Sequence, residues 1–148
     1  MLVVLASALH SLAAVVWVGG LFFAAVILRP AAGARRFALW NRALKRFFPW
    51  VSAAMVLLPA TGYLRMALDP AGLGGIGWHT IAMNLTGWAM IGLQAFVHFG
   101  PFKRLKAAAQ AETWQVAAKQ LETIRQATLV NLALGLMTVA IGASGRFW

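Results

Sequence analysis

The stretch Leu2–Leu28 reads LVVLASALHSLAAVVWVGGLFFAAVIL and decides the fold, because it is a run of 27 residues with a single ionisable side chain, that of His10. A helix of about 20 apolar residues is long enough to cross the hydrocarbon core of a bilayer. An ionisable side chain inside a membrane span is costly, and for that reason it marks a candidate functional site. The sequence therefore predicts a membrane-spanning helix, with His10 as the first candidate site residue.

Three further apolar runs predict three more spanning helices, over about residues 48–68, 77–99 and 110–145. The last helix is expected to begin before its apolar part, because residues 107–126 lack Gly and Pro and are rich in helix formers. Composition agrees, since 61% of the residues are hydrophobic and 11% are charged. We expect an all-α integral membrane four-helix bundle, with residues 1–148 forming a single domain.

The basic residues predict how the bundle lies in the membrane. Eleven of the thirteen fall in the first and third connections: Arg29, Arg35, Arg36, Arg42, Lys45, Arg46, Lys103, Arg104, Lys106, Lys119 and Arg125. Only Arg65 and Arg146 lie on the opposite side. Because cytoplasmic loops carry an excess of Lys and Arg, we expect both termini on the outer side of a bacterial inner (cytoplasmic) membrane. The net charge of +10 then indicates anionic lipid as the partner and not nucleic acid.

The first connection includes RRFALWNRALKRF at residues 35–47, which has apolar residues at helical spacing. Phe37, Trp40, Leu44 and Phe47 recur at intervals of three, four and three, while the basic side chains lie mainly around the other faces. This pattern predicts an amphipathic interfacial helix between the first and second spanning helices. We expect it to lie on the inner leaflet and to anchor the protein to lipid, in preference to binding a partner protein.

Polar and small residues mark the helix faces expected to meet inside the bundle. On the last helix they recur at intervals of three and four: Thr128, Asn131, Gly135, Thr138 and Gly142. Membrane helices associate through such residues, because lipid provides little hydrophobic drive. The amides of Asn131, Asn84 and Gln94 need hydrogen-bond partners, which can be each other or a ligand.

Depth along the helices decides which histidines can share a ligand. His10 lies about 12 Å along the first helix, and His79 begins the third helix on the same outer side. His98 lies about 28 Å further along the third helix, so it can belong only to a separate site. His10 and His79 are therefore the candidate metal ligands. The alternative for His10 is a structural histidine bonded to a backbone carbonyl or to Ser7.

Two imidazoles on facing membrane helices suit a b-type haem, since histidine is a standard axial ligand of haem iron. Copper also accepts imidazole, although Cu(I) favours sulfur ligands. The chain has no cysteine, which excludes disulfides, thiolate metal sites and iron–sulfur clusters. Arg65, at the outer end of the second helix, is the candidate partner for haem propionates. Its alternative roles are an interfacial anchor or an ion pair with Asp69.

The first helix resembles that of the copper-resistance D (CopD) superfamily, through Ala8-Leu9-His10 and the run VWVGGLFF at residues 16–23. HemJ-type protoporphyrinogen oxidases are similar there, with a histidine followed seven residues later by Trp-x-Gly-Gly. Gly77-Trp78-His79 and the later His98 also resemble that pattern. HemJ-like proteins commonly carry a lysine two positions after the first of these two histidines, where this chain has Ile81.

The resemblance implies a small four-helix membrane protein that holds haem b, with His10, His79 and Trp17 at the cofactor. Its function would be redox chemistry or electron transfer with a quinone, porphyrin or respiratory-chain partner, including HemJ-like porphyrinogen oxidation. The alternative is a copper-binding or copper-transport protein of the CopD type. A homo-oligomeric state is left open by the sequence.

Overall fold

The computed structural model describes residues 1–28, 34–68 and 77–145, and these are helical with no β-strand. In chain order the elements are α1 (Leu2–Phe22), the short π-helix η1 (Phe23–Ile27), α2 (Ala34–Ala67), α3 (Trp78–Phe99), α4 (Pro101–Gln110) and α5 (Trp114–Ser144). Four segments are long and apolar enough to cross a membrane: Leu2–Ile27, Ala38–Ala67, Trp78–Gln110 and Trp114–Ser144. The predicted all-α, four-span architecture is confirmed.

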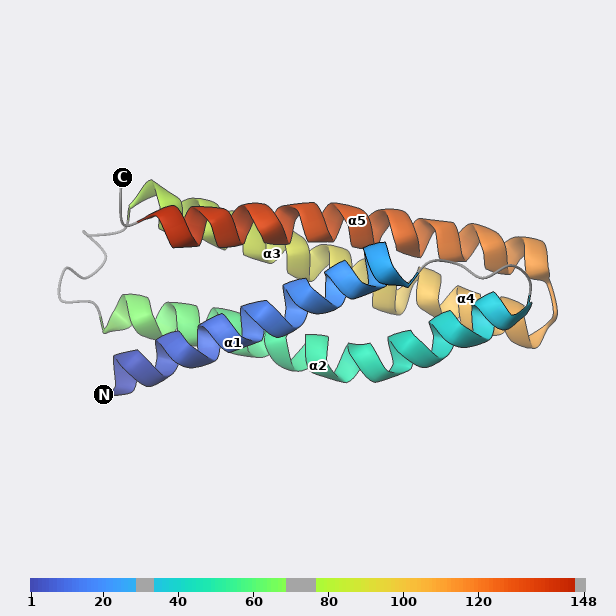
Figure 1. The fold of residues 1–148 in the computed structure, drawn as a ribbon, viewed down its shortest axis with the longest axis horizontal. Helices are drawn as coiled ribbons and strands as arrows, with labels where there is room; N and C mark the ends of the chain where they lie inside the picture. Colours follow the sequence, from blue (N-terminus) through green and yellow to red (C-terminus); the bar gives the residue numbers. More distant parts are fainter. Residues whose placement is uncertain (29–33, 69–76, 146–148) are drawn as a thin grey trace.

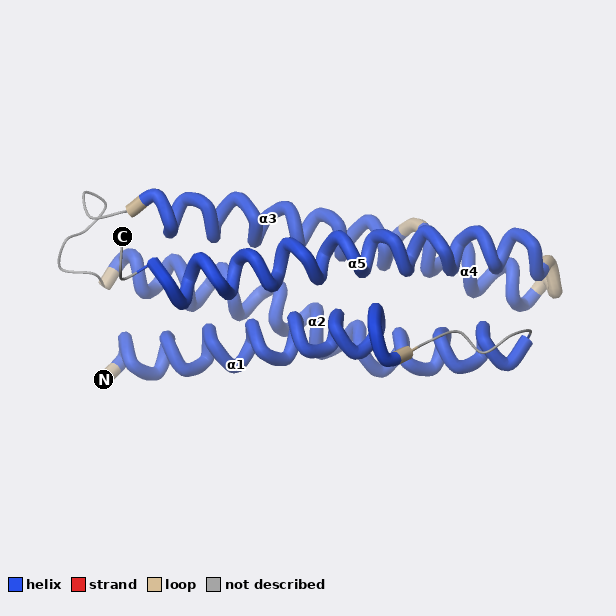
Figure 2. Tube along the Cα trace, turned by 45° about the horizontal axis from the view of Figure 1, so that its top comes forward, coloured by secondary structure: helices blue, strands red, loops and turns tan. Residues whose placement is uncertain are grey.

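The helices form two antiparallel pairs that lie side by side. α1 packs along α2, and α3 packs along α5, while α1 also contacts α5 and joins the two pairs (Figure 1). α1 begins and α5 ends at the same end of the molecule (Figure 1). The helix axes are nearly parallel or antiparallel to one another (Figure 2). The bundle is therefore elongated, and its two ends can carry different chemistry.

The chain bends between α3 and α4 at Gly100 and Pro101. Proline is tolerated at the first position of a helix, because its missing N–H would have no partner there. α4 occupies part of what the sequence indicated as a connection, and α5 begins at Trp114 instead of residue 110. The buried side chains of α4, Phe102 and Leu105 among them, join those of α5 in one apolar cluster.

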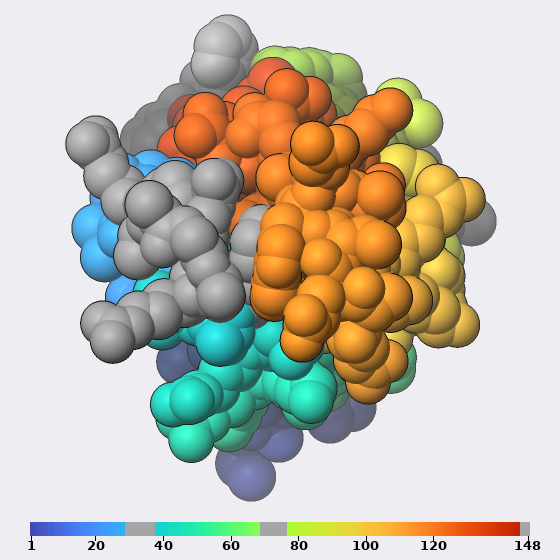
Figure 3. Space-filling view, turned by 90° about the vertical axis from the view of Figure 1, so that its right-hand side faces the viewer, coloured from blue at the N-terminus to red at the C-terminus, as the bar shows by residue number. Residues whose placement is uncertain are grey.

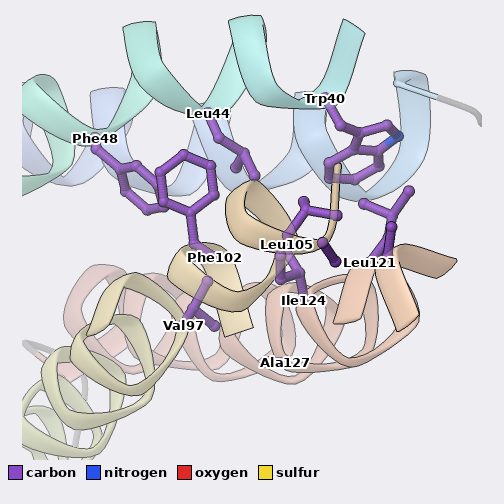
Figure 4. Close-up of a cluster of buried hydrophobic side chains, with 11 residues drawn as sticks. Trp40, Leu44, Phe48, Val97, Phe102, Leu105, Leu121, Ile124 and Ala127 are labelled. Carbon is purple, nitrogen blue, oxygen red and sulfur yellow. The ribbon is translucent and has the colours of Figure 1, made fainter. Parts of the chain in front are cut away.

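α2 is one continuous helix of 34 residues that includes the stretch predicted to lie flat on the membrane. Trp40 and Leu44 are only 1% and 3% exposed, and they pack in a cluster with Leu105 and Ile124 (Figure 4). Protein, not lipid, covers this apolar face, so the prediction of a separate interfacial helix is wrong. An amphipathic pattern identifies the apolar face of a helix but not the surface that covers it.

The long helices exceed the thickness of a bilayer. α2 and α5 are about 51 and 46 Å long, whereas the hydrocarbon core is about 30 Å thick. The part of α2 that follows Arg46 is residues 47–67, and the part of α5 that follows Arg125 is residues 126–144. Each part is about 30 Å long. We infer that these parts, with α3 and α1, cross the lipid.

We call the remaining part of the bundle, which would project beyond a hydrocarbon core placed in this way, the basic extension. It comprises the start of α2, α4 and the start of α5, which Figure 3 shows from their end of the molecule. Its charged side chains include Arg42, Lys45, Lys106 and Lys119, all exposed. The larger apolar cluster fills its interior and continues into the adjoining membrane part through Phe48, Val97 and Ala127; the other members are Trp40, Leu44, Phe102, Leu105, Ala108, Ala117, Leu121 and Ile124.

A second apolar cluster fills the middle of the membrane part. It joins α1, α2, α3 and α5 through the buried residues Ala13, Trp17, Leu21, Val51, Ala54, Met90 and Leu132. Beyond this cluster, toward the end where α1 begins, the helix contacts become polar, and that end contains the first candidate site residue.

Candidate functional site

His10 lies on the face of α1 that packs against α2. Its Nδ1 atom is 2.9 Å from Oγ1 of Thr61, a side chain that is only 6% exposed. The next residue, Gly62, lies against the ring, since a Cβ atom there would be in van der Waals contact with Cε1 of His10, at 3.4 Å. Thr61 and Gly62 therefore fix the position of the imidazole in a half-buried interface between the two helices.

The hydrogen bonds of Thr61 determine which nitrogen of His10 carries the proton. The Thr61 hydroxyl donates to the carbonyl of Leu57 at 2.5 Å and lies 3.2 Å from that of Leu58. A hydroxyl has one proton, and here it is directed at the backbone. The Thr61 oxygen must then accept from Nδ1–H of His10. In the neutral ring, Nε2 consequently carries the lone pair that can bind a metal.

Ser7 is not the partner of His10, because its hydroxyl donates to the carbonyl of Val3. The hydrogen bond that the ring makes is to Thr61 of α2. The protonated side of the ring therefore faces α2. This arrangement leaves a lone pair on the opposite nitrogen and resembles the outer-shell bonding that orients metal-binding histidines in proteins.

His79 lies in the first turn of α3, against a different part of the bundle. A Cβ atom on Gly77 would be 2.6 Å from the ring, and one on Gly145 would be 2.7 Å from it. The ring is therefore held between the start of α3 and the end of α5. The contacts of His10 and His79 involve different helix pairs, so their participation in one centre stays a prediction. The described residues contain no cluster of three or more His, Cys, Asp or Glu side chains that could hold a metal ion.

The other predicted site residues have distinct environments. Arg65 is exposed in the last turn of α2, and its alternative partner Asp69 lies outside the described residues. Trp17 is 2% exposed inside the middle cluster, and its indole N–H has no hydrogen-bond partner. His98 contacts Phe48 and Phe99, with ring centroids 4.6 and 4.9 Å away. Phe48 belongs to the cluster of the basic extension, so His98 lies on the opposite side of the middle cluster from His10.

A polar cluster between α2 and α3 was missed by the sequence reasoning. The Tyr63 hydroxyl accepts from Nδ2 of Asn84 at 3.0 Å and from the indole N–H of Trp88 at 3.1 Å. Asn84 stood out in the sequence, but its partners did not. The available signal was that Tyr63 is the single tyrosine of the chain, located two residues after Thr61.

Other polar residues inside the bundle form hydrogen bonds between α3 and α5, while Oδ1 of Asn131 has no partner among the described residues. Thr138 donates to Thr86 at 2.7 Å, and Asn131 donates to Gln94 at 3.4 Å. The amides of Asn131 and Gln94 are therefore partners, one of the two outcomes expected from the sequence. These contacts do not require a ligand, which leaves His10 as the better candidate for binding one.

Comparison with known proteins identifies one family. The family model of CopD, copper resistance protein D, matches residues 41–144. The match covers more than half of the chain and includes Thr61, Arg65 and His79, whereas His10 and Trp17 precede it. No curated protein and no solved structure matches the chain.

Proposed function

This chain belongs to the CopD family of copper resistance proteins, and from that premise we propose that it is a multi-pass membrane protein that binds copper at His10. The observation that carries the proposal is the bond between His10 and Thr61, which leaves Nε2 as an available ligand. Fixing a histidine in its coordinating tautomer is a recurrent feature of protein metal sites.

The donor set near His10 suits Cu(I). Met66 is one helical turn beyond Gly62, the residue under the imidazole, so both lie on the same face of α2. Thioether sulfur is a soft ligand that selects Cu(I), and imidazole also binds copper. His79, at the same end of the bundle, is the second imidazole that the proposal includes. No thiolate is needed, which agrees with the absence of cysteine from the chain.

Metal analysis of the purified protein tests this proposal. The protein is loaded with Cu(I) under reducing conditions, and the bound copper is measured after desalting. We expect the unaltered chain to retain copper, His10→Ala to lose it, and His98→Ala to retain it as a matched control. His98 is a fair control because its ring contacts lie in the other half of the bundle. Copper retention by His10→Ala equal to that of the unaltered chain would contradict the proposal.

Haem b is the second candidate, because the free Nε2 of His10 would equally serve as an axial ligand of haem iron. Arg65 is one turn beyond Thr61 on α2, a position from which it would bind a haem propionate. The absorption spectrum of the same preparation separates the two cofactors. If the protein contains no copper and shows a Soret band with a b-type pyridine haemochrome, the cofactor is haem b and the copper proposal is wrong. Porphyrinogen oxidation and electron transfer to a quinone or respiratory partner are functions that depend on that result.

The proposed orientation places both termini outside and the basic extension in the cytoplasm, following the distribution of Lys and Arg. The absence of native cysteine makes a direct test available. In intact cells, an impermeant maleimide should label Leu68→Cys, which is exposed just past the end of α2, and should not label Gln110→Cys, which lies at the end of α4. The reverse labelling pattern would show that both termini lie in the cytoplasm and the basic extension lies outside.

A further inference from the structure

A groove opens where the membrane part of the bundle meets the basic extension. Its volume is about 510 Å³, and it lies between the end of α1 with η1 and the first half of α2. Its walls are apolar, formed by Phe23 and Leu28 on one side and by Phe47 and Trp50 on the other. Two basic residues, Arg42 and Arg46, also line it.

Local backbone features produce this groove. η1 is a π-helical turn, closed by a bond from the Leu28 amide to the Phe23 carbonyl at 2.8 Å. π-helical turns are rare and frequently occur at functional sites. Gly20 lets the Phe47 ring lie directly against the backbone of α1, because a Cβ atom there would overlap that ring. The close approach of the two helices at Gly20 gives the groove its floor.

The charge in the groove is uncompensated within the described residues. Arg42 and Arg46 are four residues apart on α2, so their side chains are neighbours on one helix face, and both are exposed. The ion pair found in the described part of the chain joins Arg125 to Glu122, on α5. Arg42 and Arg46 therefore present two positive charges directly above an apolar surface.

We propose that this groove binds one anionic phospholipid from the leaflet at the basic end of the bundle. The phosphate group would contact Arg42 and Arg46, and an acyl chain would lie along Phe47 and Trp50. The depth of these residues matches such a lipid, because the arginines lie in the extension and Trp50 lies in the membrane part. Basic pockets between membrane helices are suited to anionic headgroups.

Charge also decides between a lipid and a second copy of this chain as the occupant. The basic extension of a second copy would bring the same exposed arginines and lysines against Arg42 and Arg46, and like charges repel. A small soluble anion would satisfy the arginines but leave the apolar walls unfilled. An anionic phospholipid satisfies both parts of the groove.

Native mass spectrometry with added lipid tests the proposal. The unaltered protein, Arg42→Gln/Arg46→Gln and Arg104→Gln/Lys106→Gln are each titrated with phosphatidylglycerol and with phosphatidylcholine of the same acyl chains. The two double variants lose the same charge, but only the first pair lines the groove. We expect one phosphatidylglycerol to bind tightly to the unaltered protein and to the α4 variant. The groove variant should bind it about 30-fold more weakly, equivalent to about 2 kcal/mol for two basic contacts.

Equal binding of the two lipids would overturn the proposal, because the headgroup charge would then have no effect. Equal losses in the two double variants would also overturn it, because any basic residue of the extension would then attract the lipid as well as Arg42 and Arg46 do. Dimers that exclude the lipid would overturn it in favour of a subunit interface. If the groove variant does not fold, a photoactivatable phosphatidylglycerol can be crosslinked to the unaltered protein. Crosslinks concentrated at residues 20–28 and 39–50 support the site, and crosslinks confined to α4 or α5 refute it.

Discussion

The two halves of this bundle are held together by different interactions. In the basic half, large apolar side chains such as Trp40, Leu105 and Leu121 are almost completely buried. In the outer half, the interhelical bonds are polar, as between His10 and Thr61 or Asn84 and Tyr63. Packing in water is driven by the hydrophobic effect, whereas helices in lipid associate through small residues and hydrogen bonds. The two halves differ in this way if the basic extension lies in water, as inferred above.

With copper bound at His10 as proposed, the main contribution to stability and the metal site would lie at opposite ends of the bundle. A rigid apolar cluster in the extension aligns α2, α4 and α5. The helices that continue from it through the membrane can then carry polar side chains whose individual contributions to stability are small. Substitutions in the two halves should accordingly differ both in size and in the property that they change.

The largest expected effect is on stability in the basic half. Leu121→Ala should lower the free energy of unfolding by about 2–5 kcal/mol, because it leaves a cavity at a side chain that is 0% exposed. Leu136→Ala, on the same helix but 53% exposed, should change it by less than about 0.5 kcal/mol. Thermal unfolding of the three proteins in detergent gives the comparison. Equal losses for both variants would show that the buried cluster of the extension contributes no more to stability than the exposed surface of the membrane part.

Adjacent glycines on α1 provide the next test. Gly20→Ala should destabilise the protein by about 1–3 kcal/mol, because the new methyl group would overlap the ring of Phe47. At Gly19 the added Cβ meets no atom within 4 Å, so Gly19→Ala should be neutral or stabilising by about 0.5–1 kcal/mol. Unfolding titrations with denaturing detergent measure the difference. If Gly19→Ala destabilises the protein more than Gly20→Ala does, Phe47 does not pack against Gly20.

In the outer half, the expected effect is on metal binding. Thr61→Val removes the oxygen that accepts from Nδ1 of His10 while keeping the shape of the side chain. Loss of such an outer-shell bond should weaken copper binding by about 10–100-fold. Competition with a chromophoric Cu(I) chelator measures the affinity. Thr123→Val, which removes a hydroxyl bonded to the backbone of α5, is the control and should leave the affinity unchanged.

The smallest effect is expected for a hydrogen bond within lipid. Thr138→Val removes the 2.7 Å bond to Thr86 and should cost about 0.6 kcal/mol, the average for such bonds in membrane bundles. A double-mutant cycle with Thr86→Val isolates the pairwise contribution. A coupling energy as large as the loss from Leu121→Ala would remove the distinction between the two halves.

The sequence predicted which side chains need a partner but not which residue on another helix provides it, because the partners lie far apart along the chain. The amides of Asn131 and Gln94 were correctly recognised as needing partners, since buried amides rarely remain unpaired, and each supplies the other. The partner of His10 could not be predicted, because Thr61 is 51 residues away and sequence periodicity describes only one helix at a time. The same limitation produced the wrong prediction of a separate interfacial helix, because Trp40 and Leu44 are covered by residues of α4 and α5.

The sequence alone determined the number of spanning helices and the position of the basic residues at one end. These depend on composition over about 20 residues, because a segment in lipid must satisfy its backbone internally and avoid charge. Only the tertiary structure decided which apolar faces meet protein instead of lipid, which nitrogen of His10 is free, and where α1 and α2 form a groove. Each of these depends on the distance between residues far apart in the chain, and packing alone sets that distance.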